Sequence, residues 1–291
     1  MRRWHADVRG RSRSVLVALP LLLAGCASTA IQENLAETNA FGTREVGQEV
    51  EVQSTPEARA AAESSARTVL AEPLTADGAV QIALGYSPTF QRMLAESAAA
   101  SAAATQSARL PNPILSYSEL AAGNLKEIDR ALTISLLDIL LLPQRLRLAD
   151  QQQVLHRLRS AGDVIATATE ARQAWVDAVA ARQSLTYAQQ AKKAAEAGAE
   201  LGRRMAAVGN FSRIEAAREQ SFYAEATADV ARAQLEAQRT REILIRLLGL
   251  SGDLAARLAL PDRLPDLPAT PDPESVLARR AFDERLDVAL A

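Results

Sequence analysis

The chain has 291 residues, 48% of them hydrophobic but only 4% aromatic, and its formal net charge is −2. This composition suits long helices that share narrow packing seams better than a thick globular core. A single cysteine excludes an internal disulfide framework and a cysteine-based metal cluster, and the mildly acidic balance argues against nucleic-acid binding.

Residues 1–25 have the features of a signal peptide. Several arginines precede an apolar run, Val15 to Leu23, which is too short to span a bilayer as a helix and ends at small residues. The sequence Leu23-Ala24-Gly25-Cys26 resembles the lipobox of bacterial lipoproteins, in which the cysteine becomes the acylated first residue. This resemblance implies lipid attachment at Cys26 and, since Ala27 rather than aspartate follows, sorting to the outer membrane.

Residues 26–73 are polar, with Gly42, Gly47 and Pro56 and no sustained apolar period. This pattern predicts an extended, lipidated tether with a short helix near 57–70.

Two helices are predicted after the tether. The first begins with Thr75 as its N-cap and ends at Tyr86-Ser87-Pro88, and the second runs from about Thr89 to Ala108. The two prolines of Leu110-Pro111-Asn112-Pro113 then require an extended backbone.

A β-hairpin is predicted over residues 114–137, with strands at 114–120 and 131–137 on either side of a turn at 121–124. In the second strand Leu132, Ile134 and Leu136 alternate with their neighbours, as expected when one face meets lipid and the other a lumen. A soluble two-stranded ribbon fits this alternation equally well.

An antiparallel helical hairpin is predicted over residues 144–248. No proline occurs between Pro143 and Gly209, which predicts one helix of about 98 Å from Gln144. Small and apolar residues recur in both helices at intervals of three and four, the spacing of a seam that lets two helices pack closely. The expected seam comprises Ala171, Ala174, Ala178, Ala181, Leu185, Ala188, Ala191, Ala195, Gly198, Gly202 and Met205 in the first helix, and Ile214, Ala217, Ser221, Ala224, Ala228, Ala231 and Leu235 in the second.

The turn of this hairpin is specified by local signals. Gly209 and Asn210 readily take left-handed backbone angles, and Phe211 follows them. Ser212 is expected to cap the next helix, with Glu215 completing a capping box.

Residues 251–291 are rich in proline up to Pro273, which predicts a connector, and a further helix is expected to begin near Glu274.

Four stretches resemble the TolC family of outer-membrane efflux channels. They are the segment from Leu74 to the L-P-N-P phrase at 110–113, the turn GNFSRIE at 209–215, ILIRLLGL at 243–250, and RLDVA at 285–289. The resemblance implies a mainly α fold whose helical hairpin is a segment of an α-barrel. It also implies that the β-hairpin contributes to a transmembrane β-barrel in a homotrimer.

The function that this resemblance implies is passive export in a Gram-negative bacterium. The chain would be the outer-membrane channel subunit of a tripartite efflux system, lipid-anchored and extending into the periplasm. It would receive substrate from an inner-membrane pump through a periplasmic adaptor that docks at the tip, Gly209, Asn210, Phe211 and Ser212.

The chain departs from the family pattern in two places. Arg204 lies five residues before Gly209, where the family has four, so that arginine's role in adaptor contact is not transferred. Family members contain two repeats, whereas residues 74–250 match the first repeat and residues 251–291 match only the start of an incomplete second one.

The alternative is a periplasmic coiled-coil adaptor or structural lipoprotein without channel activity. Adaptor hairpins are flanked by Gly/Val-rich strands, and none is visible here. An enzyme is not expected, because beyond the signal peptide His156 is the only histidine and no phosphate-binding loop occurs. Some family members are associated with heavy-metal export, but Met93 and Met205 lie far apart, so no cofactor or metal site is expected.

Overall fold

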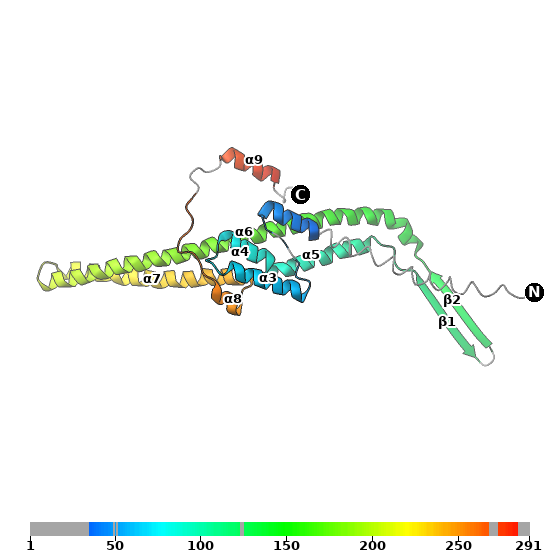
Figure 1. Cartoon of the computed structure of the whole chain (residues 1–291), viewed down its shortest axis with the longest axis horizontal. Helices are drawn as coiled ribbons and strands as arrows, with labels where there is room; N and C mark the ends of the chain where they lie inside the picture. Colours follow the sequence, from blue (N-terminus) through cyan, green and yellow to red (C-terminus); the bar gives the residue numbers. More distant parts are fainter. Residues whose placement is uncertain (1–34, 49, 51, 123–124, 268–272, 285–291) are drawn as a thin grey trace, which may run out of the picture. The chain divides into compact units, whose positions relative to one another are not determined.

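The computed structural model describes residues 35–48, 50, 52–122, 125–267 and 273–284. The signal peptide, the proposed acylation site Cys26 and the 285–289 phrase therefore lie outside the described residues. The described part is mainly helical, with one two-stranded antiparallel sheet and one long helix (Figure 1), as the sequence predicts. The chain divides into two units, described separately below, and residues 94–161 make up most of the first.

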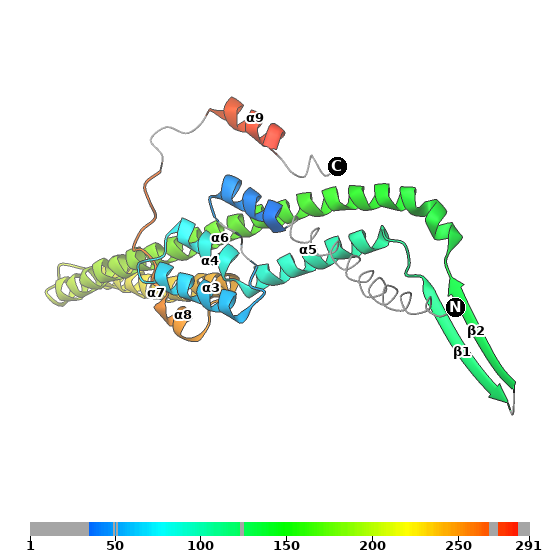
Figure 2. The same ribbon diagram turned by 45° about the vertical axis from the view of Figure 1, so that its right-hand side comes forward.

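In this first unit the second half of α5 (Pro88–Ser107) lies beside the beginning of α6 (Leu136–Ala207) in both Figure 1 and Figure 2. Polar side chains join them: Ser101 Oγ donates to Gln153 Oε1 at 2.8 Å, and Gln153 Nε2 donates to Ser101 O at 2.8 Å. The alanines of α5 allow this close approach because they add little bulk between the backbones.

The sheet of this unit differs from the predicted hairpin. β1 (Ile114–Ala122) pairs with β2 (Leu125–Thr133), so the second strand begins and ends earlier than the predicted 131–137. The first part of β2 was not predicted because its charged residues interrupt the alternation of apolar and polar side chains that indicates a strand. Residues 136–137 are helical because Ser135 caps α6, its Oγ accepting from Asp138 N at 3.4 Å.

Two sequence interpretations in this region are therefore wrong. Charged side chains occur on both faces of β2, since Lys126 and Glu127 are neighbours in the strand, so the apolar–polar alternation expected for the second strand does not run along β2. Pro143, expected to precede the long helix, lies inside it. The carbonyl that this proline leaves without a partner belongs to Ile139, an exposed residue, so water can satisfy it.

The second unit, residues 39–93 and 162–288, has its core around α4 (Ala76–Gly85), six of whose ten residues are buried. α4 is capped by Thr75 as predicted, and it is accompanied by α3 (Pro56–Val69), close to the predicted short helix. Trp175 of α6 is buried and donates from Nε1 to the Leu74 carbonyl at 2.7 Å. The largest fully buried apolar side chains of this unit are Leu74, Val80, Ile82, Leu84, Phe90, Val164, Val179, Leu244 and Leu248.

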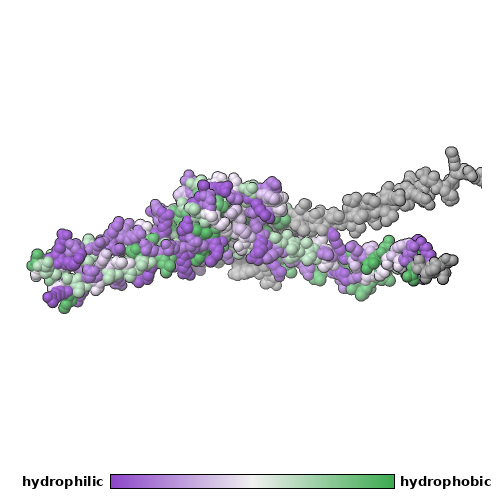
Figure 3. Space-filling view, turned by 90° about the horizontal axis from the view of Figure 1, so that it is seen from below, coloured by the Kyte–Doolittle hydropathy of each residue, from purple (hydrophilic) through white to green (hydrophobic). Residues whose placement is uncertain are grey.

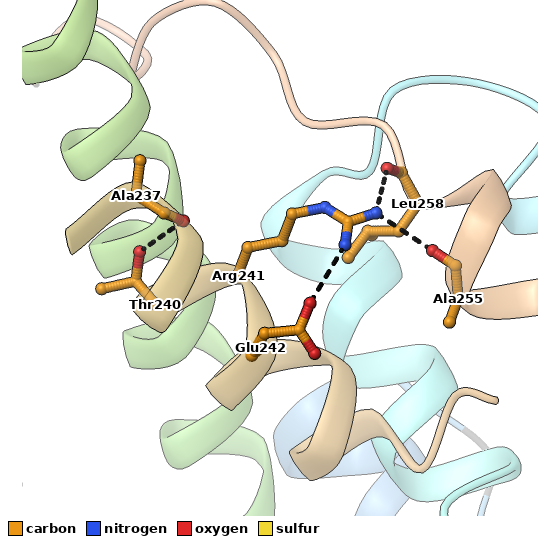
Figure 4. A network of polar contacts seen from close by, with 6 residues as sticks. All are labelled: Ala237, Thr240, Arg241, Glu242, Ala255 and Leu258. Carbon is orange, nitrogen blue, oxygen red and sulfur yellow. Dashed lines mark hydrogen bonds and ion pairs between the residues drawn. The ribbon is translucent and has the colours of Figure 1, made fainter. Parts of the chain in front are cut away.

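α7 (Arg213–Leu248) ends at Gly249, which has φ 69° and packs on the start of α5. A Cβ at Gly249 would come within 2.3 Å of Pro88 Cδ, so this close approach requires glycine. The segment that follows is held to the helices. Figure 4 shows Arg241 of α7 donating to the carbonyls of Ala255 at 3.0 Å and Leu258 at 3.4 Å.

The start of the predicted connector is therefore folded. It contains α8 (Gly252–Arg257), which the sequence interpretation missed, and Arg182 of α6 donates to Leu260 O at 2.6 Å and Asp262 Oδ1 at 2.7 Å. The expected later helix is α9 (Glu274–Glu284).

The prediction of an extended tether is also wrong in part. Residues 35–41 form an α-helix that continues into a π-helix, η1 (Gly42–Val46). Leu35, Thr38 and Gly42 are buried or half-buried at helical spacing, a short apolar period that the polar composition obscured.

Candidate functional site

α6 and α7 lie side by side in Figures 1 and 2 and pack through a seam of small residues. A Cβ added at Gly202 would lie 3.2 Å from Glu219 Cγ, and one at Gly198 would lie 3.1 Å from Glu219 Oε2. The predicted α6 seam is confirmed in that Ala171, Ala174, Ala178, Ala195 and Gly202 are buried; of the predicted set, only Ala191 is exposed. Glycine and alanine at these positions allow a short distance between the helix axes.

The predicted seam of α7 is wrong by about half a helical turn. All seven predicted residues, Ile214, Ala217, Ser221, Ala224, Ala228, Ala231 and Leu235, are exposed. The face that packs on α6 instead contains Ala216, Glu219, Tyr223, Ala226, Val230, Ala233, Ala237 and Thr240. Alanine occurs at heptad spacing on both faces of α7, so the spacing alone could not tell which face is covered.

The uncovered stripe on α7 is therefore a second seam, and we call it the outward α7 seam. Its spacings alternate between three and four residues over five helical turns, and its two largest members, Ile214 and Leu235, are 68% and 67% exposed. It lies two positions, about 200° around the helix, from the face that contacts α6.

α6 also carries an outward seam, which the sequence interpretation missed. Its small and apolar members have spacings that fit a heptad and are exposed or half-exposed: Val176, Ala180, Ala194, Ala197, Leu201 and Val208. These positions lie off the buried residues of α6, such as Val164, Ala178, Ala195 and Ala199, and they are open to solvent on the outer side of the helix. The hairpin thus presents one packing seam inside and one on each outer side.

The tip of this hairpin has the predicted local structure. Gly209 has φ 83°, and its N–H donates to Ala206 O at 3.1 Å while Asn210 N donates to Met205 O at 2.9 Å. These are the two bonds of a Schellman motif, which ends a helix with a left-handed residue and satisfies its last carbonyls. The turn therefore requires glycine for backbone reasons.

The start of α7 is held by the predicted capping box. Glu215 N donates to Ser212 Oγ at 3.2 Å, and Ser212 N donates to Glu215 Oε2 at 2.7 Å. This backbone hydrogen bond, followed by the serine side chain, lowers the pKa of Glu215. Close by on α6, the guanidinium of Arg204 holds the pKa of Glu200 below its ordinary value, through an Nε to Oε1 bond of 2.8 Å.

The tip surface combines apolar and basic side chains. Val208 is 71% exposed and Phe211 is half-buried, and Figure 3 shows green, hydrophobic surface at the left-hand end, where the α6–α7 turn lies in Figure 1. The exposed Arg203 and Arg213 flank them. The four predicted tip residues are thus brought together in one exposed turn.

The capping box predicts a measurable titration. The Glu215 side chain should titrate below the ordinary glutamate pKa, because its ionised form accepts from Ser212 N. The cap is then intact above the ordinary value and is lost as pH falls through the lowered pKa. Ser212→Ala removes the reciprocal bond and should raise the pKa toward the ordinary value. Side-chain NMR titration of both proteins measures it, and equal pKa values would contradict the capping box.

Comparisons with known proteins give little further guidance. No family model matches the chain, and no curated protein matches it. Among solved structures, a membrane protein from Pseudomonas aeruginosa is similar at 20% identity with a TM-score of 0.49, over 63% of this chain. The chain spans 46% of that protein.

Two further observations concern membrane helices and metals. None of the described helices combines the length and the apolar character needed to cross a bilayer. Within the described ranges, no three histidine, cysteine, aspartate or glutamate side chains gather in a way that could hold a metal ion.

Proposed function

We propose that this chain is a wall-forming subunit of an outer-membrane efflux channel, a passive duct that receives substrate from an inner-membrane pump through a periplasmic adaptor. One observation carries the proposal: α6 and α7 pack on each other through one seam while each keeps a second seam exposed on its opposite side. A helix pair that only had to form a stable hairpin would need one seam. Two further seams, facing outward, suit a unit that is repeated laterally.

The chemistry of these seams supports lateral assembly of helices. Heptad-spaced small residues favour near-parallel packing at a short distance, and repeating such a unit with a constant rotation closes a ring. A ring of hairpins is a tube, and its interior needs no catalytic group. Resemblance to the TolC family supports a trimer, with Cys26 as the lipid anchor in the outer membrane.

The β-hairpin supports a membrane-facing role for the other part of the chain. Exposed apolar side chains occur along both strands, with Leu115 and Leu132 next to the helices and Leu120 and Ile128 nearer the turn, where charged side chains accompany them. Near the turn Lys126 Nζ pairs with Glu119 Oε1 at 2.7 Å, and the Tyr117 hydroxyl donates to Glu119 Oε2 at 3.0 Å. We propose that this hairpin contributes strands to a transmembrane β-barrel in the trimer.

The lateral assembly predicts a specific cross-link. Ala194 and Ala224 lie at similar positions along the hairpin axis. Two nearby pairs fix this alignment of α6 with α7: Ala191 and Ala226 line one hollow, and Gly198 lies next to Glu219. Ala194 and Ala224 face opposite ways, so Ala194→Cys with Ala224→Cys cannot form a bond within one chain. In the Cys26→Ser background, mild oxidation should give disulfide-linked oligomers on non-reducing gels. The matched control is Lys193→Cys with Glu225→Cys, one residue away from each seam, and equal yields would contradict the assignment.

The function itself is tested by conduction. The protein purified from outer membranes should give stable unitary currents in planar bilayers. An assembled oligomer that never conducts would favour the structural lipoprotein alternative.

A further inference from the structure

We propose that residues at the start of α6 and the end of α5 form a binding site for the phosphate group of a membrane phospholipid. Every residue that lines the hollow belongs to the first unit of a single chain, so no neighbouring subunit is needed to complete the hollow. Its geometry rests on a cationic hollow and an apolar collar.

The hollow has a volume of about 450 Å³, and none of its eight lining residues is acidic. Two are arginines, and three carry an amide or hydroxyl group. The full lining is Ala102, Gln106, Ser107, Arg109, Leu110, Pro111, Asn112 and Arg145. Such a set of donors with a double positive charge suits an anion that has several oxygens.

Arg109 supplies one of the two positive charges of the hollow. Its Nη2 is out of contact with solvent and donates to no partner among the residues that the structure describes. A buried guanidinium nitrogen without an acceptor is costly. Arg109 also lines the hollow, and an anion there can accept from those of its five N–H groups that face it.

Arg145 approaches the same hollow from α6 and is already oriented. Its Nη2 pairs with Asp138 Oδ1 at 2.5 Å, about two turns before it on α6. Asp138 does not line the hollow, so this carboxylate fixes the arginine from outside. A guanidinium has five N–H donors, so donors remain for a second acceptor.

The opposite wall of the hollow is rigid. Residues 110–113 contain Pro111 and Pro113, whose fixed φ angles hold the segment extended between α5 and β1. The phrase Leu-Pro-Asn-Pro, which the sequence interpretation treated only as a helix end, therefore also forms part of the site.

An apolar collar adjoins the hollow in sequence on both sides. Leu136, Leu140 and Leu115 are 79%, 75% and 76% exposed, although such side chains are normally covered. The collar as a whole comprises Leu110, Ile114, Leu115, Leu132, Ile134, Leu136, Leu137, Ile139 and Leu140.

The collar decides between sources of phosphate. A free phosphate ion would bind the two arginines but would not cover the nine exposed apolar side chains of the collar. A phospholipid uses both, because its phosphate binds at the arginines while its acyl chains cover the leucines. The geometry therefore points to a phosphodiester headgroup at the bilayer surface.

The experiment measures binding of the full chain, with Cys26→Ser so that no acyl anchor contributes, to phosphatidylglycerol-containing phosphatidylcholine vesicles. Arg109→Gln should weaken binding about ten-fold by removing charge-assisted hydrogen bonds. The matched control is Arg147→Gln, an exposed arginine near Arg145 on α6 that does not line the hollow, and it should change binding less than about two-fold. Inorganic phosphate should compete with the vesicles for the unsubstituted protein.

Two further arms separate the outcomes. Leu136→Ser with Leu140→Ser should weaken vesicle binding but leave inorganic phosphate binding, measured by calorimetry, unchanged. Phosphate binding that depends on Arg109 without any vesicle binding would overturn the lipid assignment. Equal losses with Arg109→Gln and Arg147→Gln would overturn the site itself, leaving only general charge attraction. Should Arg109→Gln unfold, as circular dichroism would show, the phosphate competition and Arg145→Gln decide instead.

Discussion

Substituting Ala228, in the middle of the outward α7 seam, with glutamate should abolish side-by-side association of this chain while leaving each chain folded. In the proposed wall, Ala228 lies between two helix backbones, and an ionised carboxylate there would lose its water without gaining a partner. Removing one unpaired charge from water costs several kcal/mol. Every interface of the assembly would contain one such carboxylate and would be destabilised by this amount. This exceeds the worth of any single alanine contact in the seam.

The same substitution should leave the hairpin intact. Ala228 is exposed and lies on the side of α7 opposite the seam that packs on α6. A substitution at such a position changes the free energy of unfolding by about 0.5 kcal/mol or less. Loss of association without loss of folding is therefore the expected result.

Sedimentation in detergent and circular dichroism measure the two quantities. Gln234→Glu is the matched control, because it adds the same charge to the same exposed side of α7 at the rim of the seam. Ala228→Ser, which is small and neutral, should keep the oligomer. An Ala228→Glu protein that forms the same oligomer as the unsubstituted chain would show that the outward α7 seam is not an interface.

The parts of the fold that sequence reasoning predicted are those encoded by local chemistry. Thr75 and Ser212 cap helices as expected, and Gly209 has the left-handed angle, because each signal needs only residues within one turn. Long helices were likewise predictable, since long runs of helix formers without proline leave few alternatives.

Errors arose where the outcome depends on which partner covers a surface. The face of α7 that meets α6 could not be chosen, because both faces offer alanine at the same spacing. β2 was displaced because its charged residues, among them Lys126 and Arg130, are stabilised by pairing with β1 rather than by their own propensity. The hollow at Arg109 was invisible for the same reason, since Arg145 reaches it from a different element.

The tip provides the second large effect, on adaptor docking. Gly209→Val should weaken efflux and adaptor binding strongly while leaving assembly unchanged. Nothing lies within 4 Å of the position that a Cβ would take at Gly209, so valine meets no clash. Its cost is backbone strain alone, about 1–2 kcal/mol for a β-branched residue at φ 83°.

This strain acts locally, because both outward seams extend far from the turn, as far as Val176 on α6 and Leu235 on α7. The chain can relieve it by opening the Schellman motif, which frees the Met205 carbonyl and moves Phe211. An adaptor that reads the shape of the tip then loses its surface, whereas the outward seams stay in place. Ser212→Arg tests the same surface independently, since it removes the cap and adds bulk and charge to the tip.

The two measurements are substrate accumulation in cells and recovery of the adaptor with the tagged protein. Gly209→Asn is the matched control, because asparagine adopts left-handed angles far more readily than valine and should retain most of both activities. Loss of adaptor binding with Gly209→Val and with Ser212→Arg, with an unchanged oligomer, is the outcome that the proposed function requires. If both substituted proteins still bind the adaptor and export substrate normally, the tip is not the docking surface. The exposed Val208 and the half-buried Phe211 would then need another role, and the structural lipoprotein alternative would be favoured.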